Sequence, residues 1–155
     1  MTFKIPESVL VVVHTAAWDV LLIERADKPG YWQSVTGSKD RLDEPLDETA
    51  AREVAEETGI QVGTASVPRT ALRDWGLQNI YEIYPVWRHR YAPGVTHNTE
   101  HVFGLQLPHP VDIQLTPREH LNYQWLTWQD AAEKVFSPSN RAAILELPLH
   151  LRTED

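Results

Sequence analysis

Three glutamates at helical spacing are the residues of this chain that could do chemistry most directly. Glu53, Glu56 and Glu57 stand at positions i, i+3 and i+4, so their carboxylates share one face of a helix. Like charges at that spacing repel each other, and a divalent cation offsets the repulsion most directly. Such a cluster beside a glycine-containing loop favours a site that holds Mg²⁺ against a polyphosphate.

The alternative interpretation is a solvated acidic helix surface, which is the commoner fate of a glutamate-rich helix. Three neighbouring features favour the metal site instead. Arg52 lies four residues before Glu56 and can pair with it, while Ala50 and Val54 give the helix a buried opposite side. Residues 36–38 place a glycine turn at the end of a predicted strand.

The helix that carries these glutamates is predicted over residues 45–58. Proline is tolerated in a first helical turn, so Pro45 can begin the helix, and Asp43 or Glu44 could cap it. Gly59 is the predicted C-terminal stop.

Strands and two further helices are predicted around this helix. The expected helices cover residues 128–135 and 141–146, with Pro148 ending the last one and residues 137–140 forming a loop and cap before it. Apolar, β-branched and aromatic runs predict strands at residues 9–13, 20–24, 31–36 (stopped by Gly37), 65–72, 79–91, 100–107 and 123–126. Strands on both sides of a central helix indicate an α/β sandwich in which strand 9–13 is buried on both faces.

Composition narrows the class of protein. The 155 residues fit a single domain over 1–155, with 42% hydrophobic residues and no cysteine, which excludes thiolate chemistry. The formal net charge of −8 argues against a nucleic-acid polymer as partner. We find neither a signal peptide nor a membrane-spanning run, so a cytoplasmic location is expected. The oligomeric state is not indicated.

The spacing around the helix resembles the Nudix hydrolase motif. Glu44, seven further residues and the run 52–60 match that pattern fully, with Gly59 at its glycine. One departure stands upstream, because six residues separate Gly37 from Glu44 where the family has five. Either the loop carries an inserted residue or Asp43 occupies the glutamate position. We favour the insertion, because it preserves the step from Glu44 to Arg52.

This resemblance implies a fold, a reaction and a cofactor. The fold is a mixed β-sheet sandwiched between α-helices, with the motif as loop, helix and loop. The reaction is hydrolysis of a phosphoric anhydride with Mg²⁺, or Mn²⁺ in its place. Glu53 and Glu57 would be metal ligands, and Glu56 would be a third ligand or would accept the proton of the attacking water. Arg52 would orient the cluster.

A narrower resemblance concerns the substrate. Residues 32–38, 88–96, 98–100, 119–121 and 139–141 are similar to the branch of the family that removes pyrophosphate from dihydroneopterin triphosphate in folate biosynthesis. Two alternatives remain open. One is a nucleoside triphosphate pyrophosphohydrolase that prefers a substrate such as dATP. The other, of a different class, is a non-catalytic Nudix-like binding module.

The same resemblance assigns residues outside the helix. Glu119 would be a further metal ligand or the general base, although an exposed loop carboxylate is the alternative. Lys4 and Arg25 would bind phosphate oxygens, and Thr36 would offer its hydroxyl there or simply end a strand. Ser137 would contact substrate, and a helix cap explains it equally well.

A polar and aromatic patch completes the predicted substrate site. Tyr81, Glu82, Ile83 and Tyr84 would line the pterin pocket, with aromatic faces for stacking and Glu82 bonded to the NH groups of the ring. A half-buried alternating strand accounts for the same four residues nearly as well.

Overall fold

A mixed sheet of seven strands carries the molecule in this computed structural model, which describes residues 2–150. The strands are β1 (Glu7–Thr15), β2 (Asp19–Arg25), β3 (Trp32–Gln33), β4 (Val35–Ser38), β5 (Leu72–Glu82), β6 (His97–Leu107) and β7 (His120–Thr127). The helices are α1 (Leu46–Thr58), α2 (Trp128–Lys134), α3 (Pro138–Leu145) and α4 (Leu147–His150), with short 3₁₀ turns η1 (Arg69–Ala71) and η2 (Pro85–Arg90).

The sheet is organised around β1. Strands follow the order β3-β2-β1-β6-β5, while β4 pairs with the first half of β1 and β7 pairs with β2. The β1–β6 pair is parallel and aligns Ser8 with Glu100, whereas β5 and β6 are antiparallel and align Asn79 with Glu100. The sheet therefore brings polar residues of three strands to one place.

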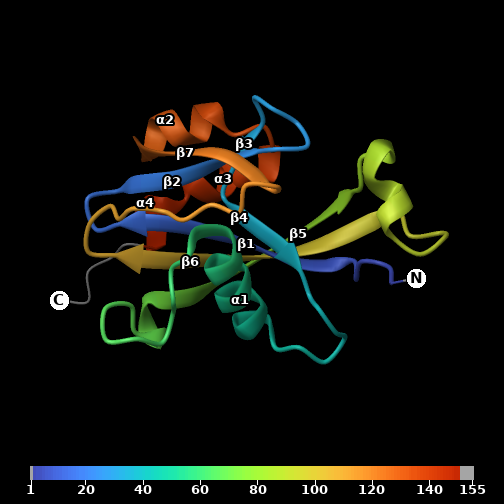
Figure 1. Ribbon diagram of the computed structural model, residues 1–155, viewed down its shortest axis with the longest axis horizontal. Coiled ribbons are helices and arrows are strands. Elements are labelled where there is room, and N and C mark those ends of the chain that lie inside the picture. Colours follow the sequence, from blue (N-terminus) through green and yellow to red (C-terminus); the bar gives the residue numbers. More distant parts are fainter. Residues whose placement is uncertain (1, 151–155) are drawn as a thin grey trace.

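Alternation along β1 builds a separate core on each face of the sheet. Val9, Val11 and Val13 pack with Val54 of α1, whereas Leu10 and Val12 pack with residues of α2, α3 and α4. Figure 1 shows the same layering, with α1 in front of the strands and α3 and α4 behind them. Burial of strand 9–13 on both faces and the α/β sandwich with a mixed sheet are confirmed.

The C-terminal end of helix α1 agrees with the prediction from the sequence, whereas its N-terminal cap does not. Gly59 is the C-terminal cap in a left-handed conformation, as predicted, and donates its backbone N–H to the carbonyl of Ala55. The predicted cap by Asp43 or Glu44 is wrong. Pro45 is the N-cap and no side chain bonds there, because the Glu44 carboxylate is turned toward Arg52 instead.

Several element boundaries also differ. Gly37 does not stop a strand but lies within β4. The predicted strand 65–72 is instead a turn followed by η1, and the predicted strand 79–91 divides into the end of β5 and η2. The last helix starts earlier, at Pro138, and Pro148 lies inside α4 rather than terminating a helix. Proline fits an early helical turn because backbone N–H groups at those positions have no partner within the helix, so the lack of an N–H costs nothing.

Within residues 2–150, the structure has no helix long and apolar enough to cross a membrane.

Candidate active site

A partly buried ion pair fixes α1 to the loop before it. Glu44 accepts hydrogen bonds from Nε and Nη2 of Arg52 at 3.0 and 3.1 Å, and from the hydroxyl of Thr49 at 2.9 Å. The bonds from Arg52 lower the pKa of Glu44 to about 2. Arg52 also donates to the carbonyl of Ser38 at 2.9 Å and so ties β4 to the helix.

The extra residue before the helix lies in the exposed part of this loop. Asp43 is 86% exposed and pairs with Arg41, whereas Glu44 is 4% exposed and holds Arg52. Glu44 therefore occupies the buried motif position. This placement fits an insertion within residues 39–43 rather than a shift in the register of the helix.

Two of the three glutamates meet beneath β4. Burial raises the pKa of Glu53 to about 7 against the charge of Arg52, and burial together with the neighbouring Glu53 raises the pKa of Glu57 well above its ordinary range. Oxygen Oε1 of Glu57 is buried without a hydrogen-bond partner. A backbone hydrogen bond from Thr36 reaches Glu57 and partly offsets the effect of burial on its pKa.

The absence of a side chain at Gly37 makes room for this pair. A Cβ atom at Gly37 would overlap the carboxylate of Glu53, so this carboxylate can lie against the strand in its present position only with glycine here. Over the described residues, no three His, Cys, Asp or Glu side chains are already gathered as a metal site. Two adjacent buried carboxylates with one unpartnered oxygen nevertheless fit a hard divalent cation, which would neutralise them.

The third glutamate and the loop carboxylate lie at the edge of this pair. Glu56 is 55% exposed and contacts Arg52 at 3.4 Å, so its carboxylate does not join the buried pair. Glu119 is exposed in the loop before β7, and its charge raises the pKa of Glu57. Burial lowers the pKa of His120 to about 4, so this ring is neutral at pH 7, with Nε2 3.9 Å from Glu57.

A cavity of about 960 Å³ opens from the acidic pair across the end of the sheet. Its lining includes Glu57, Glu119 and every residue assigned to substrate from the sequence: Lys4, Arg25, Thr36, Tyr81, Glu82, Ile83, Tyr84 and Ser137. Glu53, Glu56 and Arg52 are not in that lining. Segments from both ends of the chain thus surround one space.

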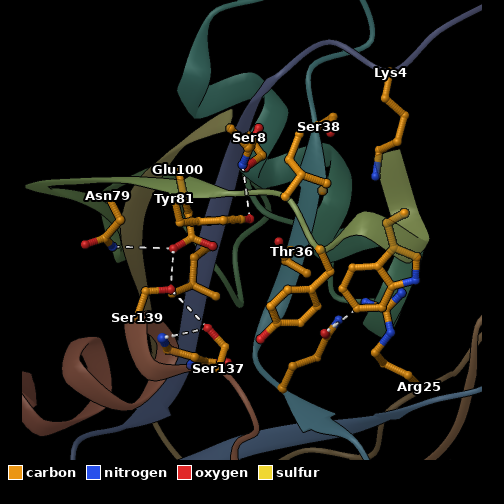
Figure 2. Close-up of a pocket in the computed structure, with 18 of the residues that line it drawn as sticks. Lys4, Ser8, Arg25, Thr36, Ser38, Asn79, Tyr81, Glu100, Ser137 and Ser139 are labelled. Carbon is orange, nitrogen blue, oxygen red and sulfur yellow. Dashed lines mark hydrogen bonds between the residues drawn. The ribbon is translucent and has the colours of Figure 1, made fainter. Parts of the chain in front are cut away.

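Two cationic side chains, Lys4 and Arg25, lie on one side of the cavity. Figure 2 shows Lys4 and Arg25 opposite the polar cluster of Glu100 and Ser139. Arg25 donates to both oxygens of Asp27 at 2.7 Å and stacks on the ring of Trp87 at 4.6 Å. Arg90 and Arg118 line the same cavity. These cations give a polyphosphate several partners.

The aromatic patch is divided between the end of β5 and the turn after it. Ile83 is buried, and the hydroxyl of Tyr81 accepts a hydrogen bond from Nδ2 of Asn98 at 3.1 Å. Burial raises the pKa of Tyr81 to about 12. Glu82 reaches the cavity edge, but its carboxylate is 67% exposed and pairs with Arg88 at 2.7 Å. Tyr84 packs against Trp87, with ring centroids 5.2 Å apart.

Ser137 is confirmed as a helix cap, and its contact with substrate stays a prediction. It lines the cavity and is also the N-cap of α3, where its hydroxyl accepts the backbone N–H of Asn140 at 3.4 Å. Its hydroxyl lies 3.1 Å from that of Ser139.

Sequence reasoning missed the polar floor of the cavity. Asn98 and Glu100 are both buried and line the cavity. The sequence does carry a signal for this floor, because side chains at every second position of a strand share a face and so share its burial. Asn98 and Glu100 stand in register with Val102, whose side chain is buried in the core beside α2 and α3.

Comparisons with known proteins agree with this geometry. A NUDIX domain matches residues 4–147. The dihydroneopterin triphosphate diphosphatases of Escherichia coli K12 and Haemophilus influenzae are 45% and 37% identical to the chain, covering 92% and 98% of it and 91% and 93% of their own lengths.

A solved structure shows the same likeness. The E. coli dihydroneopterin triphosphate pyrophosphohydrolase superimposes with a TM-score of 0.86 at 42% identity, over 97% of this chain and 99% of that one. The domain match spans most of the chain. The chain belongs to the NUDIX family.

Proposed function

We propose that this chain is a Mg²⁺-dependent pyrophosphohydrolase that converts dihydroneopterin triphosphate and water to dihydroneopterin monophosphate and pyrophosphate. The observation that carries the proposal is a cavity whose lining includes both Glu57 and the cationic side chains of Lys4 and Arg25. The relatives, which are named for this substrate and align over nearly their whole lengths, support the choice of substrate.

The cofactor follows from the acidic pair. Nudix hydrolases generally use a divalent cation, and here Glu53 and Glu57 would hold Mg²⁺ or Mn²⁺. When bound, such a cation neutralises charge on pyrophosphate oxygens and lowers the pKa of the attacking water. Arg52 keeps Glu53 in position through a 3.1 Å hydrogen bond.

The cationic residues would orient the triphosphate for attack. Lys4 and Arg25 lie on the same side of the cavity, so they can bind the phosphate oxygens while Glu57 stands nearby. The clamp of Asp27 and Trp87 holds Arg25 in one orientation. Fixed cations of this kind stabilise the negative charge that develops as the anhydride bond breaks.

Either of two carboxylates could accept the proton of water. Glu119 lines the cavity, is exposed and lies near enough to Glu57 to perturb its pKa. Glu56 is exposed but is held by Arg52 outside the cavity lining. We therefore assign the proton of the attacking water to Glu119. The anhydride bond between the first and second phosphate groups breaks, and pyrophosphate and dihydroneopterin monophosphate leave.

The proposal is tested by pyrophosphate release from dihydroneopterin triphosphate, dATP, GTP and ADP-ribose in Mg²⁺. We expect the highest kcat/KM for dihydroneopterin triphosphate, also when it competes with dATP at equal concentration. A preference for dATP would establish the nucleotide alternative. If calorimetry detects no Mg²⁺ binding with or without a triphosphate, the chain is a binding module instead.

A further inference from the structure

One carboxylate in the cavity has no role in the chemistry described above. Glu100 is 4% exposed and projects from β6 into the cavity lining. It stands opposite Asn79 in the β5–β6 pair and next to Ser8 in the β1–β6 pair. Figure 2 shows it across the cavity from Lys4 and Arg25, the cations assigned to the phosphates.

The partners of this carboxylate are neutral and approach from one side. The hydroxyl of Ser139 donates to Oε1 at 3.0 Å, and Nδ2 of Asn79 donates to the same oxygen at 3.4 Å. In Figure 2 both bonds lie on the side of Asn79 and Ser139, with the second oxygen on the side of Thr36. Within residues 2–150 no cation pairs with Glu100, and burial raises its pKa.

A buried carboxylate with neutral partners on one oxygen is costly to the fold. The same arrangement is well suited to accept hydrogen bonds from a ligand, because it has unused acceptor capacity at a fixed position. Its neighbour adds a further acceptor. Asn98 donates to Ser8 at 2.7 Å and to Tyr81 at 3.1 Å, which leaves its buried Oδ1 without a partner.

We propose that Glu100, positioned by Ser139 and Asn79, is a specificity-determining residue that accepts hydrogen bonds from the N–H groups of the substrate's heterocycle. The ring that fits best carries two adjacent N–H donors, as the 2-amino-4-oxopyrimidine edge of a pterin does. This inference rests on the proposed function. It assigns to Glu100 the contact that the sequence assigned to Glu82, whose carboxylate is paired with Arg88.

The chemistry of the edge separates possible rings. A pterin and a guanine both present a ring N–H beside an amino group, so both can bond to a carboxylate with two donors. Adenine presents its amino group beside an acceptor nitrogen, so one contact is lost. Dihydroneopterin triphosphate, GTP and ATP therefore form a graded set, tested as substrates or as competitive inhibitors.

The variant Glu100→Gln tests the assignment, with Glu133→Gln as its control because Glu133 is an exposed carboxylate on α2. A charged hydrogen bond is lost, so we expect KM for dihydroneopterin triphosphate to rise roughly 10- to 100-fold. We expect kcat to change little, and inhibition by pyrophosphate to be unchanged. The affinity for GTP should fall with that for the pterin, and the affinity for ATP should fall less.

Thermal melting without ligand separates recognition from a structural role. Because the substitution removes a buried charge that has no cation beside it, Glu100→Gln should melt at the same temperature as the native protein or higher. A lower melting temperature combined with an equal loss of pyrophosphate inhibition would overturn the assignment. So would an unchanged KM, or an equal loss of affinity for ATP.

The two proposals fail in different ways. If the native protein releases no pyrophosphate from dihydroneopterin triphosphate, the proposed function is wrong whatever the variant does. If the native protein is active and Glu100→Gln behaves like Glu133→Gln, the function stands and the role of Glu100 is wrong.

Discussion

At the scale of single residues, the fold buries two carboxylates of the site that would otherwise be exposed to water. Glu53 and Glu57 are both buried, and burial raises the pKa of each. Their helical spacing was readable from the sequence, but their depth was not, because it depends on β4 lying over them. Glu56 belongs to the same helical pattern, but its side chain is exposed and paired with Arg52.

Replacement of one ligand tests the acidic pair. We expect Glu57→Gln to fold normally and to lose at least about 100-fold in kcat, since loss of a supporting contact to a metal ligand alone costs 10- to 100-fold. Its melting temperature without metal should not fall, because a buried charge beside Glu53 is removed. Steady-state kinetics with Glu133→Gln alongside measure the effect, and near-native activity would exclude Glu57 as a ligand.

Acid unfolding tests the tie between Glu44 and Arg52. The pKa of Glu44 is depressed to about 2, so its contribution to stability is present above pH 4.5 and is lost as the pH falls toward 2. Glu44→Gln should therefore lower the free energy of unfolding at pH 7 by on the order of 3 kcal/mol. It should also flatten the dependence of that free energy on pH below 4.5.

Denaturant unfolding between pH 7 and pH 3 measures both effects. Asp43→Asn is the matched control, because the Asp43 carboxylate is exposed and pairs with the exposed side chain of Arg41. We expect it to change stability by less than about 0.5 kcal/mol. Equal behaviour of the two variants would show that Glu44 is not the buried partner of Arg52.

At the scale of elements, the sequence predicts a helix or strand correctly where residues within that one segment determine it. The valines of β1 and the cap at Gly59 are local signals, and both elements form as expected. The residues of segment 79–91 favour β-structure and predict one strand there. Pro85 instead begins η2, and the resulting turn places Trp87 and Arg90 at the cavity. A turn of this kind depends on tertiary contacts, such as the hydrogen bond from Lys4 to Arg90.

The closeness of β4 and α1 has a direct test. In Gly37→Ala the added methyl group must displace the carboxylate of Glu53, which is the end of a flexible side chain, so we expect the fold to persist. Activity and Mg²⁺ affinity should both fall, each by roughly 10-fold or more, as for other changes that misplace a metal ligand. Native Mg²⁺ affinity in calorimetry would contradict the close packing of Gly37 against Glu53.

At the scale of the whole molecule, the fold brings together cationic side chains that are far apart in the sequence. The net charge is −8, yet Lys4, Arg25, Arg90 and Arg118 all line the same cavity. They come from four distant segments of the chain, so the composition alone does not indicate that they share one cavity. The floor around Glu100 is likewise assembled from β1, β5, β6 and α3, and no contiguous stretch of sequence encodes it.

Phosphorus NMR of the products formed from dihydroneopterin triphosphate in Mg²⁺ tests the proposed reaction most directly. We expect the native protein to yield pyrophosphate and dihydroneopterin monophosphate in equal amounts, and Glu57→Gln to yield almost none. Release of orthophosphate in place of pyrophosphate would contradict the proposed reaction. Equal turnover by the variant would contradict a metal site built on Glu53 and Glu57.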